Sequence, residues 1–156
     1  MDFAEAVKVG FQNYANFRGV ASRTAFWYWR LFIFIVNIAT SFIPILGQLL
    51  SLALWLPDLT ISIRRTRDAG FSAWLQLLWV VPLGLFIFEF PSIVAYGSAH
   101  QIDFETATDS QILDALIPIA LMALPSIIAL LAVQLFFFVT FLLPTRTKEQ
   151  GNKYVK

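Results

Sequence analysis

Long apolar runs are the feature that most constrains how this chain can fold. An α-helix needs about 20 mostly apolar residues to cross a hydrocarbon core roughly 30 Å thick. We predict membrane-spanning helices at residues 26–43, 46–63, 73–95 and about 119–143. The sequence therefore predicts an all-α integral membrane protein with four transmembrane helices.

Composition also favours a membrane fold over a soluble one. Hydrophobic residues make up 58% of the 156 residues, charged residues make up 13%, and the mean hydropathy is +0.71. A soluble domain of this size could not bury so much apolar surface, because small domains bury only part of what their chains expose. Since the chain is also too short for two ordinary domains, we expect a single membrane domain over residues 1–156.

An amphipathic segment precedes the first predicted span. Within residues 1–24, Phe3, Val7 and Phe11 recur at helical spacing, and polar residues fall mostly between them. This pattern is typical of a short helix that lies on the membrane surface or against the bundle.

Proline and glycine mark the expected breaks between the apolar runs. We interpret Pro44-Ile45-Leu46-Gly47-Gln48 as a tight turn, because proline fixes φ and glycine permits positive φ. In the last run, Pro118 and Pro125 predict that the part near residues 109–118 lies in the interface or in a protein-packed kink.

The basic residues predict the orientation in the membrane. All 11 Lys and Arg residues precede or open the first span, lie between the second and third spans, or follow the last span. The loop 96–111 has none, and it carries Asp103, Glu105 and Asp109 instead. Cytoplasmic loops are enriched in Lys and Arg, so we expect residues 1–24 and the tail 144–156 on the cytoplasmic side. An odd number of crossings would separate the basic loop from the basic tail.

The first candidate site is a basic cytoplasmic face. Its arginines are Arg18, Arg23, Arg64, Arg65 and Arg67. Guanidinium groups form forked hydrogen bonds with phosphate oxygens, so this face could bind an anionic lipid headgroup. The alternative is that these arginines only set the topology.

The second candidate is an ion pair between Arg30 and Asp58. The two residues fall at similar depth if the first two spans are antiparallel neighbours, and a lone charge there is costly. Alternatively, Arg30 extends to the interface on its own and Asp58 pairs with Arg64 or Arg65 along its own helix. A third ionisable residue, Glu89, lies near the outer end of the third predicted span, and we expect its carboxylate to reach outer water.

Other kinds of site are excluded or unsupported. The absence of cysteine excludes disulfides and cysteine-based metal or catalytic sites, and the lone His100 argues against a histidine-rich metal site. No Gly-rich phosphate loop, G-x-S-x-G or H-E-x-x-H motif occurs. We therefore expect no enzymatic activity, no cofactor and no metal.

Three short motifs resemble those of a family of small bacterial inner-membrane proteins known as domain of unknown function 805. Residues 17–23 with Phe26-Trp27 resemble its F-x-G-R-x-S-R-x-E-F-W opening, with the arginine and glycine in swapped order. Residues 64–70 with Ser72 and Trp74 resemble R-R-L-H-D-x-G-x-S-G-W, and residues 151–154 resemble G-x-N-[KR]-[YF]. Ala25 stands where the family has Glu, and Arg67 stands where it has His.

The resemblance implies a bacterial inner-membrane location and an unknown role. All three motifs fall on the predicted cytoplasmic side, which adds Asp68, Gly70 and Trp74 to the candidate binding residues. Gly70 suits a left-handed turn, Ser72 can cap the third span, and Trp74 can anchor it at the headgroups. We expect partners in the membrane (anionic lipid, a membrane protein or a second copy) and no nucleic acid. The alternative is a small transporter or channel that uses Arg30 and Asp58.

Overall fold

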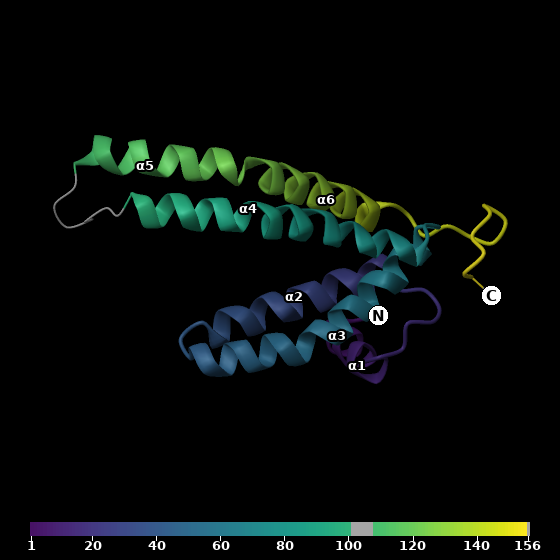
Figure 1. The fold of residues 1–156 in the computed structure, drawn as a ribbon. Helices are drawn as coiled ribbons and strands as arrows, with labels where there is room; N and C mark the ends of the chain where they lie inside the picture. Colours follow the sequence, from purple (N-terminus) through teal and green to yellow (C-terminus); the bar gives the residue numbers. More distant parts are fainter. Residues whose placement is uncertain (101–107, 156) are drawn as a thin grey trace. The chain divides into compact units, whose positions relative to one another are not determined.

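The chain folds into helices. The computed structural model describes residues 1–100 and 108–155, and within them it contains six α-helices, one 3₁₀ helix and no strand (Figure 1). The elements in chain order are α1 (Phe3–Gln12), α2 (Arg23–Thr40), α3 (Pro44–Asp68), η1 (Ala73–Trp79), α4 (Val80–Ala99), α5 (Asp109–Met122) and α6 (Leu124–Leu142). The prediction of an all-α fold is confirmed for this part of the chain.

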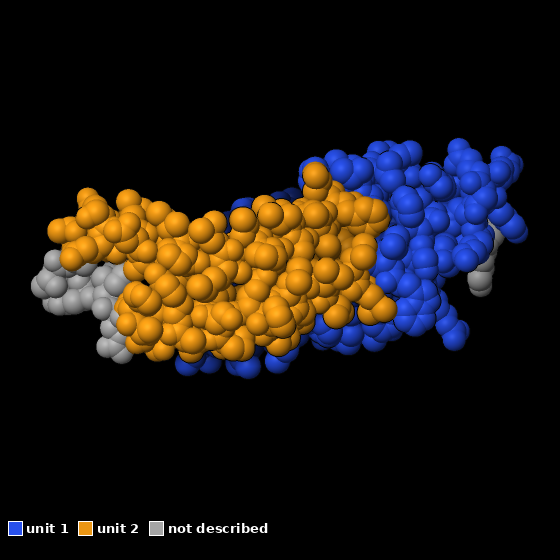
Figure 2. Space-filling view, turned by 45° about the horizontal axis from the view of Figure 1, so that its top comes forward, with its two compact units in different colours: residues 1–75, 138–156 blue, residues 76–137 orange. Residues whose placement is uncertain are grey.

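The helices divide between two compact units. Unit 1 comprises residues 1–75 and 138–156, and unit 2 comprises residues 76–137; Figure 2 shows them in blue and orange. α1, α2, α3 and the C-terminal tail belong to unit 1, whereas α4 and α5 belong to unit 2. α6 contributes residues to both units.

Within the described residues, three helical stretches are long and apolar enough to cross a membrane. They are Ile45–Asp68, Ala73–Ala99 and Leu124–Leu142, and they overlap three of the four predicted spans. α2, the counterpart of the first predicted span, is not among them. Its 18 residues include Arg23, Arg30 and Asn37, which lower its hydropathy. Ala73–Ala99 extends beyond the end predicted for the third span at residue 95, and α6 begins later than the predicted onset near residue 119.

The turn between α2 and α3 lies earlier in the chain than predicted. α2 ends at Thr40, whose carbonyl accepts a hydrogen bond of 2.9 Å from the Ile43 amide, and α3 begins at Pro44. Gly47 therefore lies inside α3. The interpretation of residues 44–48 as a turn is wrong because proline suits the first helical position, where its missing N–H is not needed.

In unit 1, α1 packs across the hairpin of α2 and α3. The buried residues of α1 are the small Ala6 and Gly10, and a Cβ on Gly10 would lie only 2.2 Å from Cε3 of Trp29. Trp29 is fully buried, and the Phe11 ring meets it edge-on at 5.3 Å. Of the two placements that the sequence left open for this segment, the structure has α1 against the hairpin.

In unit 2, α4 runs alongside α5 and α6 (Figure 1). Thr108 precedes α5, and its amide donates a hydrogen bond of 2.9 Å to Gln111 Oε1, as expected for a capping residue. α5 continues through Pro118 to Met122, and the break before α6 falls at Ala123. The Trp79 and Phe137 rings stack at 5.6 Å.

Candidate functional site

The C-terminal end of α3 is shaped by Gly70. This glycine has φ +86°, and its amide donates to the Arg67 carbonyl at 2.9 Å, while the Phe71 amide donates to the Thr66 carbonyl at 3.1 Å. A left-handed glycine is the usual residue after a helix end, because a side chain would be strained there. The predicted left-handed turn is confirmed. It ends α3 directly after the arginines.

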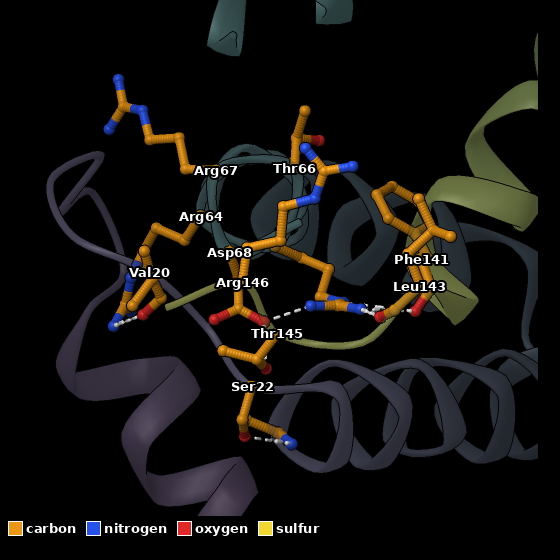
Figure 3. A network of polar contacts seen from close by, with 12 residues as sticks. Val20, Ser22, Arg64, Thr66, Arg67, Asp68, Phe141, Leu143, Thr145 and Arg146 are labelled. Carbon is orange, nitrogen blue, oxygen red and sulfur yellow. Dashed lines mark hydrogen bonds and ion pairs between the residues drawn. The ribbon is translucent and has the colours of Figure 1, made fainter. Parts of the chain in front are cut away.

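Arg65 and Asp68 form a buried ion pair at this helix end. Figure 3 shows Asp68 together with Phe141, Leu143 and Thr145, which the pair contacts. Arg65 Nη1 contacts Asp68 Oδ2, while Nε and Nη2 donate to the Phe141 carbonyl at 3.2 and 3.0 Å. Nη2 also donates to the Leu143 carbonyl. Asp68 Oδ2 accepts a further bond of 2.7 Å from Thr145 Oγ1. The pair thus binds the end of α3 to the end of α6.

Asn152 fastens the C-terminal tail to the same place. Its buried side-chain amide donates to the carbonyls of Arg67, Asp68 and Arg146 at 3.0, 3.2 and 3.1 Å. The Arg146 amide donates to the Asp68 carbonyl at 2.9 Å, and the Tyr154 amide donates to Asn152 Oδ1 at 3.0 Å. The Asn152 side chain therefore connects the tail, at Arg146, with the last turn of α3.

The segment before α2 is bonded to α3 as well. The Ala21 amide donates to the Arg64 carbonyl at 3.2 Å, and Arg64 Nη2 donates to the Val20 carbonyl at 3.1 Å. Arg67 Nη1 donates to the Phe17 carbonyl. All three family-like motifs thus meet at one place in unit 1. We call the side chains that join them the polar cluster, which comprises Arg64, Arg65, Arg67, Asp68, Thr145 and Asn152.

Ser22 caps α2 although the family's Glu is missing. Its Oγ accepts a hydrogen bond of 3.3 Å from the Ala25 amide. Ser72 likewise accepts from the Trp74 amide at 3.4 Å, just before η1. Trp74 itself is 77% exposed, so it packs against little of the protein.

Burial divides the predicted basic face into two groups. Arg65 and Asp68 are buried and bonded within the chain, so they cannot contact a lipid and drop out of the predicted binding surface. Arg64 and Arg67 are half-buried, and each binds a backbone carbonyl. Arg18 and Arg23 are exposed, and among the described residues their side chains make no hydrogen bond or ion pair.

Further exposed basic residues, which are not part of the predicted site, lie on the C-terminal tail. They are Arg146, Lys148 and Lys153. The Arg146 guanidinium lies over the Phe71 ring at 5.7 Å, and Lys153 Nζ lies over the Tyr154 ring at 5.3 Å. The signal in the sequence was the third motif, whose asparagine brings this basic tail to the end of α3.

The structure places Arg30 and Asp58 in contact. Arg30 Nη1 lies 3.0 Å from Asp58 Oδ2, and Arg30 Nη2 donates to Ser62 Oγ at 3.3 Å. Further along the same hairpin, Ser51 Oγ donates to Asn37 Oδ1 at 3.5 Å. An open hollow of about 430 Å³ lies beside the turn, lined by Asn37, Thr40, Ser41, Gly47, Gln48 and Ser51. Polar residues therefore follow the α2–α3 hairpin from the ion pair to the turn.

Glu89 does not reach solvent. It is buried in unit 2, where its Oε1 accepts a hydrogen bond of 3.2 Å from the Ser126 amide. The expectation of a solvated carboxylate is wrong, because it rested on position within one span and took no account of a partner on α6. Asp103 and Glu105 lie outside the described residues. No group of three or more His, Asp or Glu side chains that could hold a metal occurs in the described part.

Among the comparisons with known proteins, the scan against protein families gives a match. No curated protein and no solved structure matches the chain. One family, described as "Protein of unknown function (DUF805)", matches residues 14–156, a range that contains all three motifs of the polar cluster. The chain therefore belongs to the DUF805 family.

Proposed function

We propose that the protein crosses the bacterial inner membrane four times, with both termini in the cytoplasm. The first crossing is α2, although the hydropathy of α2 alone does not identify it as a membrane span. It packs along α3, to which a short turn joins it, so a spanning α3 carries α2 into the bilayer with it. Arg30 is tolerable there because Asp58 neutralises it at 3.0 Å.

The distribution of charge supports this orientation. Unit 1 contains every Lys and Arg of the chain, whereas unit 2 contains acidic residues and no Lys or Arg. Four crossings place all the basic residues on the cytoplasmic side.

Single-cysteine variants test the topology cleanly, because the natural chain has no cysteine. Ser22→Cys, His100→Cys and Lys148→Cys are treated with a membrane-impermeant maleimide before and after the membrane is opened. Only the His100 variant is expected to react from outside. External labelling of the Lys148 variant would refute the proposed orientation.

We further propose that exposed basic side chains around the polar cluster bind anionic lipid headgroups, without enzymatic activity. One observation carries this proposal. Arg18, Arg23, Arg146, Lys148 and Lys153 are exposed on segments that the cluster joins, and among the described residues they make no side-chain hydrogen bond or ion pair. Guanidinium and ammonium groups in such a position attract phosphate, and each adds to binding at an anionic surface.

The test is to extract the protein with its native lipid shell and identify the retained molecules by mass spectrometry. We expect anionic lipid to be enriched with the natural protein and lost from an Arg18→Gln/Arg23→Gln variant. The matched control is Arg18→Lys/Arg23→Lys, which keeps the charge and should keep part of the enrichment. A bulk lipid profile for all three proteins would leave the arginines as topology signals. Selective recovery of a membrane protein or a second copy would replace lipid as the partner.

The polar residues of the α2–α3 hairpin support a second candidate, a small transporter or channel. Asp58 Oδ1 is buried and takes no part in the contact with Arg30, which uses Oδ2, and Asn37 and Ser51 continue the polar line toward the turn. Ionisable residues inside a membrane commonly mark ion or substrate paths. Flux through proteoliposomes that Asp58→Asn abolishes would support this candidate. Absence of flux with and without a membrane potential would refute it.

A further inference from the structure

Glu89 is a buried carboxylate of unit 2 with only one of its oxygens bonded. The residue is 9% exposed; Oε1 accepts from the Ser126 amide at 3.2 Å, while Oε2 is buried and has no hydrogen-bond partner among the described residues. The Ser126 hydroxyl is not available to it, because it donates to the Ala123 carbonyl at 2.9 Å.

The break between α5 and α6 creates the donor that Glu89 uses. α5 ends at Met122, and Pro125 lies in the first turn of α6. The first amides of a helix have no acceptor within it, so the Ser126 amide is free to donate to a neighbouring helix. Oε1 thus lies at the positive end of α6, where a carboxylate oxygen is favourable. Oε1 alone satisfies the Ser126 amide at the start of α6, so Oε2 is available to bind another group.

Among the described residues, Glu89 makes no ion pair, and its own unit offers no Lys or Arg. The whole segment 76–137 contains no Lys or Arg. Asp109 and Asp114 on the adjacent α5 are acidic and exposed, and α6 carries no charged residue. The other titratable groups on this side are Tyr96 near the end of α4 and His100 directly after it. The described part of unit 2 therefore offers no Lys or Arg that could offset a bare carboxylate at Glu89.

Glu89 also lies at depth in a stretch that can span the membrane. From Glu89 to the end of α4 at Ala99 is about ten residues, or roughly 15 Å of helix. Both α4 and α6 belong to stretches long and apolar enough to cross the hydrocarbon core. Water is absent there, so an unneutralised carboxylate is strongly disfavoured.

We propose that Glu89 is a binding site for a single monovalent cation, which Oε2 takes up as a proton or an alkali-metal ion. Binding neutralises the carboxylate, while Oε1 keeps its hydrogen bond to the start of α6. The cation therefore stabilises the contact between α4 and α6. One such carboxyl is a site and not a path, so this inference is independent of the proposed lipid binding and of transport along the α2–α3 hairpin.

A hydrophobic carbodiimide is the probe for this site, because it enters the membrane and reacts with a carboxyl that carries a proton. The acid O–H adds across a C=N bond: the carboxyl oxygen joins the central carbon, and the proton goes to nitrogen. The reconstituted full-length protein is treated, digested and mapped by mass spectrometry over a range of pH, with and without Na⁺ or K⁺. Glu89→Gln removes the reacting group but keeps an oxygen for the Ser126 amide. Asp114→Asn is the matched control, since it removes an exposed acid of the same unit.

We expect one carbodiimide adduct on Glu89 in the natural protein and in Asp114→Asn, with labelling lost in Glu89→Gln. Labelling that decreases as pH rises and is indifferent to Na⁺ and K⁺ identifies the cation as a proton. Protection by Na⁺ or K⁺ at constant pH identifies an alkali-metal ion. If Glu89 is unlabelled at every pH and salt condition while the protein remains folded, the proposal is overturned, and Glu89 is only a cap for α6.

Discussion

Arg65 and Asp68, which lie three residues apart at the end of α3, form an ion pair buried inside unit 1. Arg65 also binds the backbone at the end of α6, and Asp68 binds Thr145 in the tail. Arginines in a loop between two spans are expected to face the cytoplasm and the lipid headgroups. Arg65 instead joins α3 to α6, which are distant in the sequence. The exposed basic residues around it remain available to bind lipid headgroups.

Replacing Arg65 should destabilise the protein strongly. Arg65→Gln leaves the Asp68 carboxylate buried without its cation, a change that costs about 3–5 kcal/mol in typical proteins. Arg64→Gln is the control, because it removes one bond to the Val20 carbonyl, worth about 1 kcal/mol. Thermal unfolding in detergent should show a much larger loss for Arg65→Gln. Equal shifts for the two variants would mean that the ion pair contributes little.

Asn152 should hold the tail in place. Asn152→Ala removes three donated hydrogen bonds, and we expect a loss of about 1–3 kcal/mol together with faster tryptic cleavage at Arg146 and Lys148. Asn16→Ala is the matched control, because Asn16 is exposed and its side chain bonds only locally, donating to Asn13 and accepting from the Arg18 amide. Unchanged cleavage kinetics in Asn152→Ala would contradict the proposed role of this residue.

Comparing alanine variants of Gly70 and Gly19 distinguishes the cost of backbone strain from the cost of steric crowding. Both have positive φ, so alanine at either site should cost about 1–2 kcal/mol. A Cβ on Gly70 would also lie 2.8 Å from Arg146 Cδ, whereas nothing lies within 4 Å of a Cβ on Gly19. Gly70→Ala should therefore be the more destabilising by thermal unfolding, and adding Arg146→Ala should remove the excess. An excess that survives in the double variant would point to a different cause.

The Arg30–Asp58 pair should behave as a coupled unit. Arg30→Gln and Asp58→Asn each leave one charge unpaired within the hairpin, so each should lower the unfolding temperature. The double variant should be more stable than the sum of the single losses predicts, with a coupling of about 0.5–3 kcal/mol. Strictly additive losses would show that the two side chains do not support each other.

Features that depend on length and local backbone preference could be predicted from the sequence. The apolar runs at residues 46–63, 73–95 and about 119–143 predicted three stretches that the structure has with shifted ends, at Ile45–Asp68, Ala73–Ala99 and Leu124–Leu142. Gly70 predicted the left-handed turn. The ion pair between Arg30 and Asp58 could also be predicted, because antiparallel neighbouring helices place both residues near the same end of the hairpin. The Pro44 turn was misplaced because proline suits both a turn and the first position of a helix.

Features that depend on distant partners could not be predicted. Arg64, Arg65 and Arg67 look alike in sequence, and only the docking of α6 and the tail decides that Arg65 is buried. Burial of Glu89 depends on the helix break at Ala123, which brings an unbonded amide beside α4. In both cases the deciding contact joins residues that are far apart in the chain.

The most direct test of lipid binding is the thermal stability of the protein in nanodiscs of defined composition. A ligand that binds only the folded state raises its unfolding temperature. Anionic lipid should therefore stabilise the natural protein relative to zwitterionic lipid, and Arg18→Gln/Arg23→Gln should lose most of that stabilisation. If anionic lipid stabilises both proteins equally, or neither, then the exposed arginines do not bind its headgroups and the account is wrong.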